Sequence, residues 1–171
     1  EFSKTPGKLP KDAVPVHYDL VLVPNLAAAT TKGILNVELE VSRALDRLTL
    51  NAVDIEFTKV EIVDANIVTA RPKADGNSQT AVIPLSQTLP PGRHHLRVEF
   101  NGKISEKAEG LYFDRYQTAA GEKRLLVTMM EPTDARRMFP CWDEPAFRAT
   151  FQLTVTVPDH HAAVSNMPVE R

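Results

Sequence analysis

Apolar and polar residues alternate along most of this chain with a period of two residues, as they do in β-strands that have one buried face. The alternation is clearest in residues 35–41, where leucines and valines occupy the odd positions and polar residues the even ones. The same pattern, in places shorter, predicts strands at residues 16–23, 35–41, 48–50, 55–62, 67–69, 81–85, 94–100, 112–116, 123–130 and 151–157. Turn residues such as Asp75-Gly-Asn77 separate these segments. We therefore predict an all-β fold of sandwich-like antiparallel sheets.

One segment, Glu131–Pro145, interrupts the alternation with a dense mixture of charged, proline and aromatic residues. A short helical turn is predicted near residues 133–138, because Thr133 or Asp134 could cap it and Pro140 would stop it. A β-sheet protein gains nothing generic from such an insertion. The segment is therefore expected to build something specific.

Composition narrows the classes of function. With 171 residues and 43% hydrophobic content, the chain can bury a core of its own. The net charge of −2 provides no basic field to recruit nucleic acid, and no run of about 20 apolar residues could span a membrane. Cys141 is the single cysteine, so no disulfide forms within the chain.

Both ends of the sequence suggest a piece of a longer polypeptide. Residues 1–9 are expected to form an N-terminal arm or to be left over from cloning, with Glu1 and Phe2 either native or not, and residues 10–171 are expected to form the domain. The missing initial methionine is compatible with a removed leader, which slightly favours an exported bacterial protein over a cytoplasmic one.

The histidines and the cysteine do not suggest a metal or nucleophilic site. His94-His95 and His160-His161 are adjacent pairs, and neighbours on a strand point to opposite faces. No His-Glu-x-x-His motif is present, so we expect structural or solvent-facing histidines. Cys141 has no nearby histidine to act as a base, and we expect it to be buried.

The acidic residues of the 131–145 segment leave two interpretations open. Asp143 and Glu144 could be an acid/base pair, but a structural role, with ion pairs to Arg136 or Arg137, is favoured. Glu131 follows an apolar strand and precedes a proline. Its carboxylate could face a cleft, or could form a salt bridge with one of the same arginines.

The segment Glu131–Pro145, continued to Phe151, closely resembles the M1 family of zinc aminopeptidases, the aminopeptidase N-like gluzincins. Further matches follow in order along the chain: Val14–Leu20, Leu50–Ala52, Gly110–Tyr112 and Ser165–Pro168. The resemblance implies a saddle-shaped, all-β N-terminal domain. The family's His-Glu-x-x-His zinc motif and Gly-x-Met-Glu-Asn loop belong to a second domain and do not occur here. The resemblance thus implies zinc in the parent protein, but no catalytic residue and no metal ligand in this chain.

The resemblance does imply one direct role in substrate binding. Glu131 matches an acidic residue that helps to bind the free α-amino group of the peptide, with Met129 and Met130 beside it in the first specificity pocket. Met129 stands where the family usually has glutamine, which predicts a more apolar pocket. The peptide bond after Glu131 tends to be cis in the family, and here it precedes Pro132, where the cis form costs least. The implied partners are peptides with a free N-terminus and the catalytic domain of the same polypeptide.

Two other functions are possible alternatives to the aminopeptidase. Some relatives of this architecture have lost the zinc motif and serve as interaction scaffolds; a His-Glu-x-x-His motif downstream would exclude that role. Retention of Glu131 favours an enzyme, because a scaffold need not keep an ammonium anchor. A free-standing sandwich that binds carbohydrate or protein lacks support, since few exposed aromatic residues are expected and Trp142 lies inside the family motif.

Overall fold

The computed structural model describes residues 2–170 and confirms the predicted all-β fold. Eleven strands, one short α-helix and one 3₁₀ turn occur in this range. In chain order they are η1 (Phe2–Lys4), β1 (Ala13–Asn25), β2 (Thr30–Val41), β3 (Leu45–Asn51), β4 (Glu56–Ile62), β5 (Ile67–Val68), β6 (Ala74–Asp75), β7 (Thr80–Leu89), β8 (Gly92–Lys103), β9 (Gly110–Thr118), β10 (Gly121–Met129), α1 (Ala135–Met138) and β11 (Thr150–Val155). Each predicted strand segment overlaps one of these strands.

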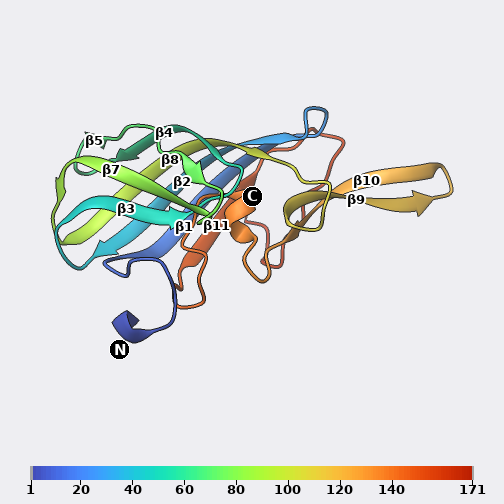
Figure 1. Ribbon diagram of the computed structural model, residues 1–171. Helices are drawn as coiled ribbons and strands as arrows, with labels where there is room; N and C mark the ends of the chain where they lie inside the picture. Colours follow the sequence, from blue (N-terminus) through green and yellow to red (C-terminus); the bar gives the residue numbers. More distant parts are fainter. Residues whose placement is uncertain (1, 171) are drawn as a thin grey trace.

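The strands form two facing sheets and a separate hairpin (Figure 1). The larger sheet has the order β11-β1-β2-β8-β4-β5, and the smaller one has the order β3-β7-β6. Neighbouring strands are antiparallel, as predicted, with one exception: β11 pairs in parallel with β1. The larger sheet is therefore mixed, because the chain returns to its first strand by a long crossover that contains α1.

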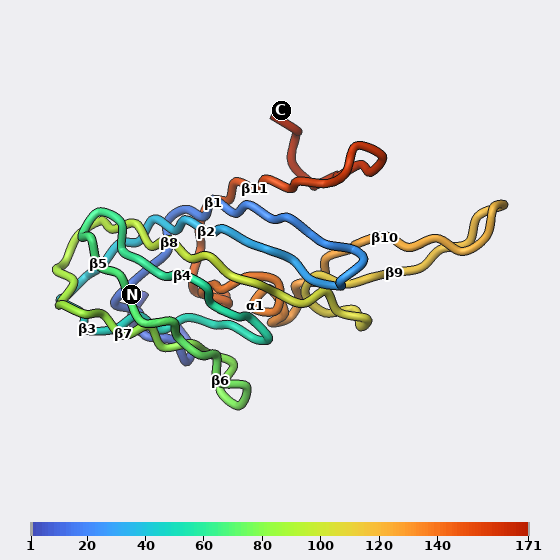
Figure 2. Tube along the Cα trace, turned by 90° about the horizontal axis from the view of Figure 1, so that it is seen from above, coloured from blue at the N-terminus to red at the C-terminus, as the bar shows by residue number. Residues whose placement is uncertain are grey.

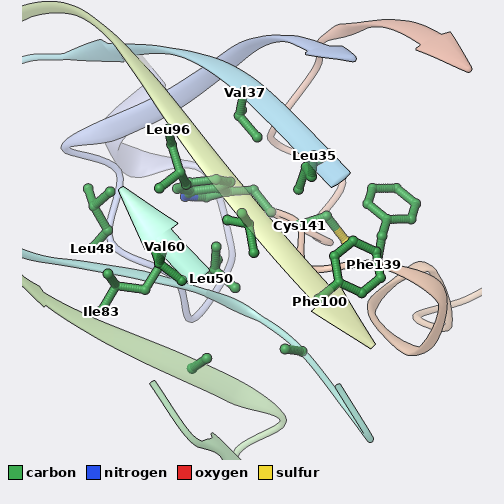
Figure 3. Packing of buried hydrophobic residues seen from close by; sticks show 14 of the residues in the cluster. Leu35, Val37, Leu48, Leu50, Val60, Ile83, Leu96, Phe100, Phe139 and Cys141 are labelled. Atoms are coloured by element: carbon green, nitrogen blue, oxygen red, sulfur yellow. The ribbon is translucent and has the colours of Figure 1, made fainter. Parts of the chain in front are cut away.

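The core lies between the two sheets. Apolar residues at alternate positions of β2 and β8 face those of β3 and β7, which explains the period of two in the sequence (Figure 3). The segment after α1 enters the same core, where Phe139 and Cys141 pack beside Phe100 of β8 (Figure 3). The part of the 131–145 segment from Met138 to Trp142 thus belongs to the sandwich interior.

Strands β9 and β10 form a hairpin that projects from one end of the sandwich (Figures 1 and 2). Side-chain pairs hold the two strands together: the Arg124 guanidinium lies 3.7 Å from the centre of the Phe113 ring, and Arg115 and Glu122 form an ion pair of 2.9 Å. The base of the hairpin is apolar and joins the core through Leu111 and Phe113. Strand β10 runs back along this hairpin and delivers the chain to Glu131.

Helix α1 is the helical turn that the sequence predicted, and it ends before Pro140. Asp134 occupies the position before its first turn, but its side chain makes no capping hydrogen bond. The carboxylate instead accepts a hydrogen bond from Arg137 Nε at 2.9 Å. The capping role considered for Asp134 is therefore wrong, because an arginine one turn later competes for the same oxygen atoms.

Candidate functional site

The three residues that the resemblance assigns to substrate binding, Met129, Met130 and Glu131, lie where the hairpin rejoins the sandwich. Gly110 and Met129 form the last pair in the register of β9 and β10. The chain turns immediately afterwards, because the backbone N–H of Asp134 donates to the Met130 carbonyl at 2.8 Å. Glu131 therefore stands in a closed turn between β10 and α1. The Glu131–Pro132 peptide bond is cis, which confirms the sequence prediction.

The side chains of these three residues have different surroundings. Met130 is half-buried and packs against the core. Met129 is 42% exposed, and Glu131 is exposed as well. Met129 and Glu131 are thus accessible from outside the domain, whereas Met130 supports the turn from within.

Glu131 does not form the salt bridge that the sequence left open. Arg136 donates to Asp143, and Arg137 donates to Asp134. Within residues 2–170, no hydrogen bond or ion pair joins the Glu131 carboxylate to another group. Its charge is therefore not used in holding the domain together.

Arg136 ties α1 to the sandwich and is itself buried. Its guanidinium donates from Nε to Asp143 Oδ2 at 2.9 Å, from Nη2 to the Asp143 carbonyl at 2.9 Å and from Nη1 to Gln79 Oε1 at 3.0 Å. The Arg136 carbonyl accepts a hydrogen bond from the Val53 N–H at 2.9 Å. The Arg136 side chain thus fixes α1, the segment at Asp143 and the segment at Gln79 relative to one another. The structural role predicted for Asp143 is confirmed.

The neighbouring residues Cys141 and Trp142 are buried and held through their backbone. Cys141 and Asn51 exchange two backbone hydrogen bonds of 2.8 and 3.0 Å, and the Trp142 N–H donates to the Tyr18 hydroxyl at 3.2 Å. Burial, and then the charge of Asp143, raise the pKa of the Cys141 thiol. The sequence prediction of a buried Cys141 is confirmed. A thiol held in its neutral form in the core is a poor nucleophile.

Glu144 binds the N-terminal arm. Its Oε1 atom accepts hydrogen bonds from the backbone N–H groups of Lys8 at 2.6 Å and Leu9 at 3.0 Å. Gly7 precedes them with φ at +150°, and a Cβ atom at this position would overlap Glu144 Oε2. Leu9 is part of the buried core, so the packing of the core includes the last residue of the segment predicted as an arm. Glu1, the first residue of that segment, lies outside the described residues. The division at residue 9 remains a prediction.

His94 and His95 point to opposite faces of β8, as expected for neighbours on a strand. The expectation does not apply to His160 and His161, which lie beyond β11 outside any strand, with ring centres 4.3 Å apart. His94 is buried, with Nδ1 at 2.7 Å from Asp64 Oδ2 and Nε2 at 2.9 Å from the Pro90 carbonyl oxygen. His95, the next residue on β8, is exposed. Across residues 2–170, no group of three or more histidine, cysteine or acidic residues is arranged to hold a metal ion.

Two acidic residues near the site were missed in the sequence. Asp54 and Glu109 both lie near Arg137: Asp54 Oδ2 is 4.0 Å from Nη1, and Glu109 Oε2 is 3.7 Å from Nε. Glu109 directly precedes Gly110, which was the only signal available in the sequence. Asp54 is about eighty positions away from Arg137 along the chain, and only the folded arrangement reveals the contact.

Comparison with known proteins identifies the family of this chain. Residues 14–171 match the model of the Peptidase M1 N-terminal domain. The chain belongs to the M1 aminopeptidase family. The resemblance seen in the 131–145 segment is thereby confirmed, and the two-sheet body with its projecting hairpin is the N-terminal domain of an M1 protein.

Individual relatives agree with this assignment. Aminopeptidase N of Acetobacter pasteurianus is 39% identical over 169 residues, which are 98% of this chain and 47% of that protein. Aminopeptidase M1 of Arabidopsis thaliana is 38% identical over 168 residues, 95% of this chain and 19% of that protein. Human endoplasmic reticulum aminopeptidase 1 is 33% identical over 172 residues, 95% of this chain and 18% of that protein. The M1 domain therefore spans about half or less of the length of these relatives.

Membership of the M1 family implies a zinc ion in the parent protein, but the residues of this domain do not fit one. Zinc in proteins takes three or four nitrogen, sulfur or carboxylate ligands, and residues 2–170 bring no such set together. No step that involves the metal is therefore assigned to this M1 domain. Within the same residues, no helix is long and apolar enough to cross a membrane.

Proposed function

We propose that the whole protein to which this M1 domain belongs is a zinc-dependent aminopeptidase, and that Glu131 binds the α-amino group of its peptide substrates. The observation that carries the proposal is the state of the Glu131 carboxylate: it is exposed and makes no bond within residues 2–170. The other acidic residues of the segment, Asp134, Asp143 and Glu144, all accept hydrogen bonds. Glu131 alone among them keeps its charge available for a ligand.

The chemistry of a peptide N-terminus suits this carboxylate. An ammonium group that leaves water needs an anionic acceptor, and a charge-assisted hydrogen bond contributes about 1.5–3 kcal/mol. The turn that carries Glu131 is closed by a backbone hydrogen bond and followed directly by α1. A carboxylate on such a fixed turn can hold the first residue of the substrate in one orientation, which favours removal of one residue at a time. The zinc and its ligands would come from the catalytic domain of the same polypeptide.

The anchor role is tested by Glu131→Ala in the full-length protein. We expect kcat/KM for a peptide with a free N-terminus to fall by about 10–100-fold, the factor that corresponds to a lost charge-assisted hydrogen bond. Glu40→Ala, which removes an exposed glutamate of β2 far from the turn, is the matched control and should leave kcat/KM unchanged. An unchanged kcat/KM in Glu131→Ala would contradict the proposal.

Met129 is proposed to form an apolar wall of the first specificity pocket, with Met130 supporting it from inside. The exposed fraction of Met129, 42%, leaves its thioether free to contact a substrate side chain. Met129→Gln in the full-length protein should lower the preference for apolar over polar first residues, measured as a ratio of kcat/KM values, by about five-fold. Identical ratios in the variant and the parent would remove Met129 from the pocket.

A further inference from the structure

Two adjacent arginines of α1 contact different parts of the domain. Arg136 is buried and bonds to Asp143 and Gln79 in the sandwich. Arg137 points to the base of the β9–β10 hairpin, where its Nε lies 2.9 Å from Asp134 Oδ1 and 3.7 Å from Glu109 Oε2. The helix thus lies between the body of the domain and the hairpin that leads to Glu131 (Figure 2).

The guanidinium of Arg137 gathers carboxylates from three separate segments. Asp54 lies in the connection between β3 and β4, Glu109 directly precedes β9, and Asp134 closes the turn that contains Glu131. The Arg137 side chain is 27% exposed, so water weakens these attractions only in part. The planar guanidinium can address several oxygen atoms at once, which a lysine ammonium at the end of a flexible chain cannot do with the same geometry.

Gly110 allows the helix and the hairpin to pack closely. Its φ of +63° is a left-handed conformation, and a Cβ atom there would lie 2.8 Å from Arg137 Cβ and 3.2 Å from the Asp134 carbonyl oxygen. Gly110 also pairs with Met129 in the hairpin register. The turn before α1 therefore rests directly on the last backbone pair of the hairpin, with no side chain between them.

We propose that Arg137 is a positioning residue for Glu131. By joining Asp134 to Glu109 and Asp54, it fixes the Met130–Asp134 turn on the hairpin base and so sets where the Glu131 carboxylate stands. Arg137 makes no bond to Glu131 itself within residues 2–170, and it acts only through the turn. This inference rests on the proposed role of Glu131 as the substrate anchor.

A double-mutant cycle in the full-length protein tests the inference. Arg137→Met should lower kcat/KM for a peptide with a free N-terminus by about ten-fold, mainly through a higher KM, because a displaced anchor holds the ammonium less well. In the Glu131→Ala background, the same substitution should change kcat/KM by less than about two-fold, since no anchor is left to misplace. Arg93→Met, which removes a paired arginine from β8, is the matched control and should have no effect in either background.

The conservative variant Arg137→Lys provides a second test in case the Arg137→Met protein does not fold. It keeps the positive charge, and we expect a loss of about three-fold in kcat/KM, again only when Glu131 is present. Equal losses in both backgrounds, or no loss in the presence of Glu131, would overturn the role of Arg137 while leaving the anchor intact. If Glu131→Ala alone had no effect on kcat/KM, both the anchor and the positioning role would be overturned.

Discussion

Towards one end of the Glu131–Pro145 segment the side chains are buried and bonded to the sandwich, and at the other end the Glu131 side chain is exposed and makes no bond within residues 2–170. Cys141 and Trp142 pack into the core, and Asp143 holds the buried Arg136. Ten residues earlier, the Glu131 carboxylate faces outward with no partner in residues 2–170. The two ends are joined by a single turn of helix.

Asp143 and Glu131 are both acidic residues of this segment, but their surroundings in the folded domain differ. The Asp143 side chain is 14% exposed and pairs with the buried Arg136, so its removal would leave a buried cation without its counter-charge. Glu131 is exposed, and its carboxylate makes no bond within residues 2–170 that would stabilise the domain. A carboxylate on a closed turn that makes no bond within residues 2–170 is available to a ligand, which is the role proposed for Glu131.

The largest effect on stability is expected at the buried end. Arg136→Met should lower the free energy of unfolding by about 3–5 kcal/mol, because it leaves the Asp143 carboxylate buried without its cation. The two side chains are only 10% and 14% exposed. Urea unfolding monitored by circular dichroism measures the loss. Arg43→Met removes an ion pair whose arginine side chain is 65% exposed, and it should cost less than about 1 kcal/mol; equal losses in the two variants would contradict the comparison.

An intermediate effect is expected where the N-terminal arm meets Glu144. Gly7→Ala should lower the free energy of unfolding by about 1–3 kcal/mol, because alanine resists φ of +150° and its Cβ would overlap Glu144 Oε2. Gly76→Ala is the matched control: nothing lies within 4 Å of the added Cβ and its φ is not positive, so the free energy of unfolding should not fall and should rise by up to about 1 kcal/mol. A Gly7→Ala protein as stable as the Gly76→Ala protein would show that the arm is not held at this point.

Much of the fold and part of the site could be predicted from the sequence. The strands follow from the period of two, since residues such as Leu35 and Leu39 face the core from one side of β2. The burial of Cys141 and the cis bond at Glu131–Pro132 were also predicted correctly. These features depend on local chemistry or on a motif that can be recognised within a few residues.

What could not be predicted depends on contacts between distant segments. Gln79 reaches Arg136 across 57 positions, and Glu144 binds the N–H of Lys8 across 136 positions. The parallel pairing of β11 with β1 is of the same kind. Periodicity shows which face of a strand is buried, but not which other segment covers it or pairs with it.

The smallest effect on stability is expected at Glu131, and it is the sharpest test of the contrast. Glu131→Ala should change the free energy of unfolding by less than about 0.5 kcal/mol, since an exposed side chain without a partner contributes little to the folded state. Asp143→Ala, measured in the same urea titration, should lose several-fold more. A loss above about 1 kcal/mol in Glu131→Ala would mean that the carboxylate holds the turn in place. In that case a lower kcat/KM of the variant would follow from a distorted turn. If the free energy of unfolding is unchanged, the lower kcat/KM follows from the lost contact between Glu131 and the substrate.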